Sequence, residues 1–158
     1  MKQDMERPFD ISADLDTPVS TFLKLKPLNP CFLLESVEGG THLARYSFLG
    51  LGEVSRIVIR DGKFYAGGES VATPKSTEEL LQCFRQVLKE LPDLKPEITD
   101  MPFSGGLVGF GSYDLVRYFE SIPKPTSKGC DLDPPDASYI APKSLIIFDH
   151  LTRRIALL

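Results

Sequence analysis

The sequence lacks the features that mark membrane, secreted and nucleic-acid-binding proteins. No apolar run approaches the ~18 residues that a membrane-spanning helix needs, and residues 1–8 lack the apolar segment of a signal peptide. A formal net charge of -4 leaves no basic excess to neutralise a phosphate backbone. We therefore expect a cytoplasmic protein that has no membrane or nucleic-acid partner and binds a small ligand.

Residues suited to disulfides, metals and nucleophilic catalysis are also few. The three cysteines, Cys31, Cys83 and Cys130, are widely separated and form no Cys-x-x-Cys motif, which argues against a disulfide framework and a zinc site. With only His42 and His150 available, a histidine-based metal site is disfavoured. No nucleophile motif and no carboxylate cluster suited to magnesium is present. By themselves, the residues disclose no reaction.

The composition is that of one soluble globular domain, with 158 residues of which 42% are hydrophobic and 25% charged. The hydrophobic patterns predict mostly strands, and Asp61-Gly62 is typical of a type I′ hairpin turn. We predict an α+β fold, mainly an antiparallel β-sheet with a few helices packed on it. Strands are expected at residues 31–36, 46–51, 53–60, 63–66, 143–150 and 153–158.

Three segments have helical signals. Thr17-Pro18 is typical of a helix start, and Pro27 is expected to end that short helix. Ser76 begins a capping box, after which apolar residues recur at helical spacing up to Pro92. A short helix follows Ser112, in which Arg117 is expected to pair with Asp114 or Glu120.

Two further segments are expected to be irregular or closely packed. Residues 103–111 are rich in glycine but lack the spacing of a phosphate-binding loop, so we interpret the glycines as marks of a bulge or of close backbone approach. Five prolines between residues 122 and 142 predict a surface connection.

The segment 31–40 and the strand that follows it have the pattern of a pocket wall. On a strand, Phe32, Leu34 and Ser36 share one face, so an apolar wall ends in a hydroxyl group. Glu35 adds a charge, and Gly39-Gly40 allows the chain to turn back into Arg45-Tyr46-Ser47-Phe48. The residues alone also permit a simpler interpretation, in which Ser36 merely ends the strand and Glu35 is solvated.

Several segments, taken in order along the chain, resemble the N-terminal region of anthranilate synthase component I, a family of chorismate-utilising enzymes. They are residues 17–25, 32–40, 45–50, 105–110, 113–120 and 145–150. The resemblance implies that residues 1–158 are the N-terminal regulatory domain of a larger two-sheet α/β/β/α enzyme. The apolar strand pattern that stops at Leu158 agrees with that expectation.

The family resemblance also implies a chemistry. The full-length enzyme is a lyase that converts chorismate and ammonia to anthranilate and pyruvate in tryptophan biosynthesis. A glutamine amidotransferase subunit, component II, supplies the ammonia. The residues that bind Mg2+ and chorismate are expected in a C-terminal domain absent from this chain. The chain alone is therefore expected to be inactive and to hold no catalytic residue.

For this chain, the resemblance implies a part of the feedback site that binds L-tryptophan. Leu34, Glu35 and Ser36 match the family's tryptophan-binding element, and Ser36 is the strongest of these assignments. Tyr46 or Phe48 could line the indole ring from the returning strand. The rest of the site, a proline-containing loop, is expected outside this chain.

Two other functions are considered beside this one. The first is the N-terminal part of aminodeoxychorismate synthase component I, a folate-pathway relative with the same architecture. The second is a stand-alone amino-acid-binding module without enzymatic activity.

Overall fold

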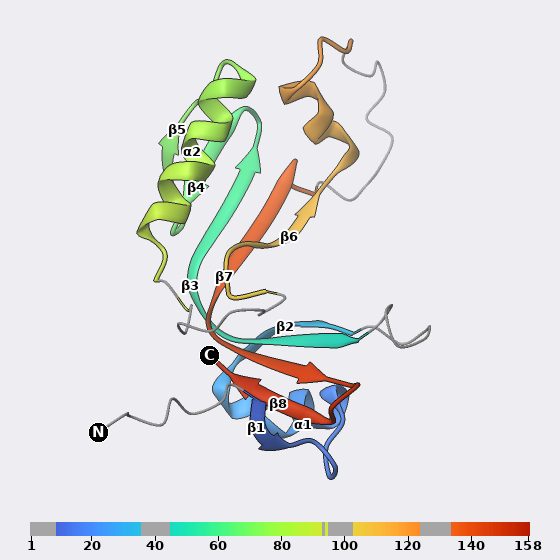
Figure 1. Cartoon of the computed structure of the whole chain (residues 1–158). Coiled ribbons are helices and arrows are strands. Elements are labelled where there is room, and N and C mark those ends of the chain that lie inside the picture. The colour runs from blue at the N-terminus through green and yellow to red at the C-terminus, as the bar shows by residue number, and fades with distance from the viewer. Residues whose placement is uncertain (1–8, 36–44, 93, 95–102, 124–133) are drawn as a thin grey trace, which may run out of the picture. The chain divides into compact units, whose positions relative to one another are not determined.

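The computed structural model describes residues 9–35, 45–92, 94, 103–123 and 134–158. The chain forms two compact units: unit 1 comprises residues 1–53, 92–105 and 142–158, and unit 2 comprises residues 54–91 and 106–141. Two long strands, β3 (Tyr46–Arg60) and β7 (Ala137–Asp149), each contribute one part to unit 1 and the other to unit 2. These strands are hydrogen-bonded neighbours and run in opposite directions (Figure 1).

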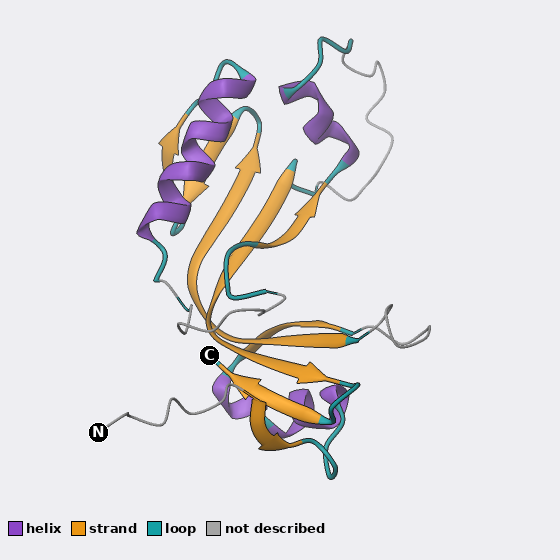
Figure 2. Ribbon diagram, viewed as in Figure 1, coloured by secondary structure: helices purple, strands orange, loops and turns teal. Residues whose placement is uncertain are grey.

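Unit 1 contains a sheet in the order β1-β8-β7-β3, with β2 on the other side of β3. Its remaining strands are β1 (Phe9–Ser12), β2 (Pro30–Leu34) and β8 (Arg154–Leu157), and each pairs antiparallel with its neighbour. Figure 2 shows how strongly strands predominate. The predicted fold class, a mainly antiparallel α+β fold, is confirmed. Strand β1 was not predicted.

Alternation along the strands gives the sheet of unit 1 an apolar cluster on each face. On one face, Leu49 and Phe148 are buried beneath Phe22 and Leu25 of the helical segment. That segment consists of α1 (Pro18–Lys24), its C-cap residue Leu25 and the 3-10 helix η1 (Lys26–Leu28). The other face carries a second cluster, formed by Leu145, Ile147 and Ala156 with Phe32, Tyr46, Phe48, Leu94, Phe103 and Leu158.

Helix α1 begins where the sequence predicts. Thr17 is the N-cap, its hydroxyl accepts a hydrogen bond from the Ser20 amide, and Pro18 occupies the first turn. The helix ends earlier than predicted, at Lys24, because the chain tightens into η1, which tolerates Pro27 in its own first turn. Asn29 then takes a left-handed conformation with a φ of 54° and turns the chain into β2.

Unit 2 contains a sheet in the order β6-β7-β3-β4-β5. Its shorter strands are β4 (Lys63–Ala66), β5 (Glu69–Ala72) and β6 (Val108–Gly111). The predicted hairpin turn is confirmed, since Asp61 and Gly62 have φ values of 51° and 76°. Strand β5 was not predicted, although Gly67 and Gly68 before it also have positive φ.

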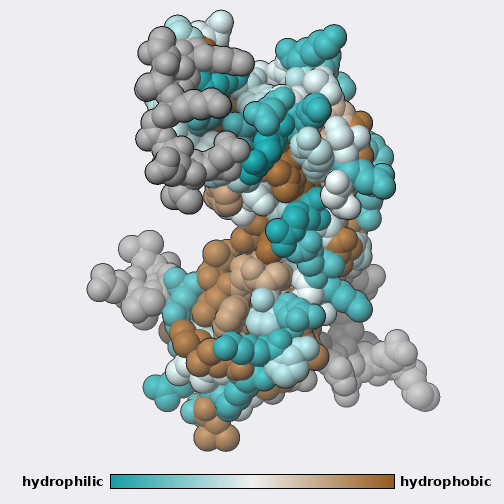
Figure 3. Space-filling view, turned by 180° about the vertical axis from the view of Figure 1, so that it is seen from behind, coloured by the Kyte–Doolittle hydropathy of each residue, from teal (hydrophilic) through white to brown (hydrophobic). Residues whose placement is uncertain are grey.

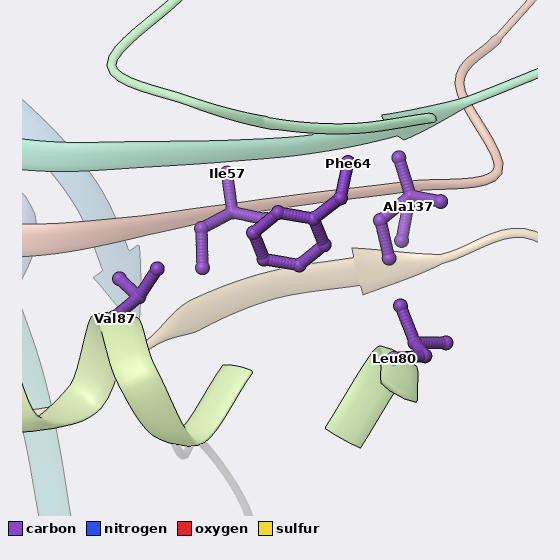
Figure 4. Close-up of a cluster of buried hydrophobic side chains, with 6 residues drawn as sticks. Ile57, Phe64, Leu80, Val87 and Ala137 are labelled. Atoms are coloured by element: carbon purple, nitrogen blue, oxygen red, sulfur yellow. The ribbon is translucent and has the colours of Figure 1, made fainter. Parts of the chain in front are cut away.

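Helix α2 (Thr77–Glu90) packs against the sheet of unit 2. Ser76 is its N-cap, as predicted, and accepts a hydrogen bond from the Glu79 amide. The Glu79 carboxylate accepts from the Lys75 amide instead of the Ser76 amide, so the capping box is only half formed. Figure 4 shows the core between the helix and the strands, where side chains from α2, β3, β4 and β7 converge: Leu80, Val87, Ile57, Phe64 and Ala137.

The glycine-rich segment is closely packed, as the sequence predicts. A Cβ atom at Gly109 would overlap the backbone of Ser138 and Tyr139 on β7. The next segment forms the 3-10 helix η2 (Tyr113–Tyr118), in which the Arg117 guanidinium pairs with Asp114 at 2.8 Å. Ser112 precedes this helix but makes no side-chain cap.

Tyr118 joins several segments of unit 2. Its hydroxyl accepts a hydrogen bond from the Gly62 amide and donates one to the Asp136 carboxylate. Its backbone carbonyl accepts a hydrogen bond from the Thr77 hydroxyl. Burial and the neighbouring Asp136 carboxylate raise the pKa of Tyr118 to about 12, so the hydroxyl keeps its proton at neutral pH.

Two long strands differ from the predicted pattern. Strand β3 is continuous over residues that are predicted as two strands. Gly52, which separates the two predicted strands, takes a φ of 64°, and this conformation of a glycine does not end the strand. Strand β7 begins at Ala137 and runs through Pro142, although the prolines predict an irregular segment there. Pro142 lies between the residues paired with β6 and those paired with β8, where a missing amide is tolerated.

The core of unit 2 generates the first prediction. Leu80→Ala should lower the free energy of unfolding by about 2–5 kcal/mol, because it leaves a cavity at a fully buried position. Leu88→Ala, on the same helix but 46% exposed, is the matched control and should cost much less. Urea unfolding of the protein that contains the chain measures both, and equal costs would contradict this account of the core.

Candidate functional site

The predicted site residues lie on the hairpin formed by β2 and β3 in unit 1. Leu34 pairs with Phe48, Leu33 with Leu49, and Phe32 with Gly50. A Cβ atom at Gly50 would overlap the Phe32 ring, so this ring lies across the glycine. Any larger residue at position 50 would displace the Phe32 ring from its observed place.

An aromatic row runs along one face of this hairpin. The Tyr46 and Phe48 ring centroids are 6.4 Å apart, and Phe103 meets Phe48 edge to face at 5.7 Å. Edge-to-face contact is a favoured geometry for aromatic pairs. Leu34, the cross-strand partner of Phe48, is 46% exposed. The structure thus brings Leu34, Tyr46 and Phe48 together in a half-exposed apolar wall, and hydrophobic side chains are visible on the surface of unit 1 in Figure 3.

Glu35 does not lie in this wall. It lines a cavity of about 480 Å3 together with Phe148, whose side chain belongs to the opposite face, the one covered by α1. The other lining residues are Ala13, Asp14, Asp16, Thr17, Pro18, Asp149, His150 and Arg153. The predicted residues are therefore divided between two faces. Ser36 lies outside the described residues.

A charged pair that the sequence analysis did not assign lies beside the hairpin. The Arg45 guanidinium donates two hydrogen bonds to the Asp149 carboxylate, from Nε at 3.1 Å and from a terminal nitrogen at 2.7 Å. Such a two-bond geometry is the strong form of this contact. The Arg45 side chain is 37% exposed, whereas that of Asp149 is only 3% exposed.

Asp149 is held in its charged form. Burial alone would raise its pKa, but the Arg45 guanidinium and the amides of Thr152 and Leu151 bond to the carboxylate, and together they lower the pKa below 3.8. The carboxylate thus pairs with Arg45 and orders the turn that follows β7. The only sequence signal for this pair was the presence of both residues in segments that match the family.

His150 adds a second connection. Its backbone amide donates to the Arg45 carbonyl at 2.8 Å. Its ring lies 2.7 Å from the hydroxyl of Ser47, a fully buried residue, and stacks on Phe148. Residues 45 and 47, at the start of β3, are therefore bonded to residues 149 and 150, at the end of β7.

The described residues offer no alternative site of a familiar kind. Among them, no group of three or more His, Cys, Asp or Glu side chains is placed to hold a metal ion. Of the cysteines in the described residues, Cys31 and Cys83 are not joined in a disulfide, and the Cys31 thiol donates a hydrogen bond to the Gly52 carbonyl at 3.2 Å. In the described part of the chain, no helix has the length and apolar composition that crossing a bilayer requires.

The fold and the hairpin define a β-rich α+β domain with an aromatic wall on one face of a sheet and an acidic cavity on the other. The chain is 41% identical over 140 residues to anthranilate synthase component 1 of Thermus thermophilus, which covers 88% of this chain and 28% of that protein. It is 37% identical over 143 residues to the same protein of Acinetobacter calcoaceticus, covering 88% of this chain and 29% of that protein. No family model matches the chain.

A solved structure shares the fold. The crystal structure of anthranilate synthase component I from Streptococcus pneumoniae aligns with a TM-score of 0.58 and 23% identity, covering 94% of this chain and 30% of that one. By the sequence matches, about nine-tenths of the chain corresponds to a segment of the anthranilate synthase component I family. It spans about three-tenths of the length of the relatives that it matches.

The lowered pKa of Asp149 generates the second prediction. Asp149→Asn should cost about 1–3 kcal/mol of unfolding free energy at pH 7, because the charged pair with Arg45 is lost. The folded-state pKa lies below the unfolded value near 3.8, so the stabilisation is present above that pH and is lost as the pH falls through the folded-state pKa. Urea unfolding between pH 2 and 7 checks this, and a cost for the variant that is independent of pH would contradict it.

Proposed function

We propose that the chain is the N-terminal part of an anthranilate synthase component I and contributes to its L-tryptophan feedback site. The observation that supports this is similarity to anthranilate synthase component 1 over about nine-tenths of the chain. The full-length protein would convert chorismate and ammonia to anthranilate and pyruvate. Its chorismate and Mg2+ sites would lie in the remainder, and component II would supply ammonia from glutamine in the cytoplasm.

In this proposal, the aromatic wall is the part of the feedback site that binds the indole ring. Leu34, Tyr46 and Phe48 offer an apolar surface that is incomplete by itself, since Leu34 is 46% exposed. Burying an indole of ~200 Å2 contributes roughly 5 kcal/mol before the ordering costs are subtracted. Apolar burial would therefore supply most of the affinity.

Polar groups at the end of β2 would select the amino acid. Ser36 comes two residues after Leu34 in the sequence, and its hydroxyl would satisfy a polar group of the ligand. Glu35 would bind the ammonium group. Glu35 directly follows the last residue of β2 and lines the cavity on the opposite face, so in this proposal it would bind the ammonium group from beyond the end of the strand.

Activity and product identity give the third prediction. The protein encoded by the whole reading frame that contains this chain should form fluorescent anthranilate from chorismate and ammonia, whereas residues 1–158 alone should form none. If the product is instead aminodeoxychorismate, detected as 4-aminobenzoate after a lyase is added, the folate-pathway alternative is correct. A reading frame that stops after codon 158 would favour a stand-alone module.

The feedback site gives the fourth prediction. In the full-length protein, Ser36→Phe should abolish inhibition by L-tryptophan while ammonia-dependent turnover of chorismate continues. Loss of the hydroxyl alone, in Ser36→Ala, should remove ~1–3 kcal/mol of ligand binding, which is a ~5- to 150-fold weaker inhibition. Inhibition curves measure both.

Ser70→Phe is the matched control for this experiment, since Ser70 is exposed on β5 in unit 2 and should leave inhibition unchanged. Normal tryptophan inhibition in Ser36→Phe would refute the assigned role of Ser36.

A further inference from the structure

We propose that Arg45, held by Asp149, is a positioning residue for the tryptophan-binding hairpin. This inference rests on the proposed feedback site and adds two residues to it that do not touch the ligand. It predicts that the pair controls the affinity for the inhibitor and has no part in the conversion of chorismate.

The first observation is that Arg45 has its conformation set by a buried partner. Both oxygens of the Asp149 carboxylate accept bonds from the guanidinium, and Asp149 is itself bonded by the amides of Leu151 and Thr152. A planar guanidinium bound at two points has little freedom to rotate. The position of Arg45 is therefore dictated by the turn that follows β7.

The second observation is that Arg45 lies over the ring of Tyr46. The guanidinium carbon is 4.8 Å from the ring centroid, within the range of a cation–π contact. Tyr46 in turn contacts Phe48, the residue paired with Leu34. The cation thus restrains one end of the aromatic wall that would receive the indole.

The third observation is that the residues on both sides of Tyr46 are bonded to the same short segment. The Arg45 carbonyl accepts from the His150 amide, and the Ser47 hydroxyl is bonded to the His150 ring. Asp149 and His150 also line the cavity that Glu35 lines. One segment, residues 149–150, is therefore bonded to the neighbours of Tyr46 in the aromatic wall and lines the same cavity as Glu35.

These contacts distinguish the pair from an ordinary ion pair of the surface. The Lys24–Asp16 pair is also in unit 1, but its lysine is 64% exposed and its partner 32%, and it joins no residue of the aromatic wall. Loss of an exposed pair of that kind has little effect on its surroundings. Loss of Arg45 should instead release the Tyr46 ring.

The test uses the full-length protein and measures the concentration of L-tryptophan that halves the rate, together with kcat and KM for chorismate. Arg45→Gln and Asp149→Asn should each raise that concentration about tenfold or more, with kcat and KM within about twofold of the wild-type values. Arg45→Lys keeps the cation but not the two-bond geometry, so it should show a smaller shift. Lys24→Gln is the matched control and should shift neither quantity.

Arg45→Gln leaves the Asp149 carboxylate buried without its partner, so the double variant Arg45→Gln/Asp149→Asn, which removes both charges, is measured as well. It should also be desensitised to L-tryptophan, because no cation remains over Tyr46.

Desensitisation with unchanged kcat and KM supports the inference. If tryptophan inhibition is unchanged in all of these variants, or if kcat falls in parallel with the loss of inhibition, the role assigned to Arg45 is wrong. Loss of inhibition in Ser36→Phe would then show that the proposed feedback site itself still stands. A wild-type protein that tryptophan does not inhibit overturns the proposed site itself.

Discussion

The pairing of β3 with β7 is the interaction on which the rest of the structure depends. Each strand is long enough to contribute one part to unit 1 and another to unit 2, so the same two strands are central in both sheets. In unit 1 they are flanked by β2 and β8, and in unit 2 by β4 and β6. Neither core could form without them, because each core cluster includes side chains from these strands.

The same pairing explains why the hairpin of β2 and β3 has a defined shape. Strand β2 is at an edge of its sheet and pairs only with β3 among the described strands. Its conformation therefore depends on β3, whose start is bonded to the end of β7 through Arg45, Ser47, Asp149 and His150. An edge hairpin without such contacts would be among the less stable parts of a domain. The contacts between the start of β3 and the end of β7 therefore hold the half-exposed aromatic side chains of the hairpin in a defined position.

Local signals in the sequence predicted the elements that local interactions stabilise. The cap at Thr17, the cap at Ser76 and the turn at Asp61-Gly62 each depend on residues within three positions of one another. Long-range pairing decided the differences. Strand β1 exists because β8 offers it an edge, and β7 extends through Pro142 because its neighbours change there from β6 to β8.

The sequence by itself determined the family resemblance, the α+β class, and the shared face of Phe32 and Leu34, since side chains alternate along any strand. It also placed Tyr46 and Phe48 on the returning strand. Only the tertiary structure showed that Glu35 lines a cavity on the face opposite to the aromatic wall. It alone also showed that Arg45 pairs with Asp149, a residue 104 positions away. A contact of that separation has no periodic signal in the sequence, because it depends on which strand ends the fold brings together.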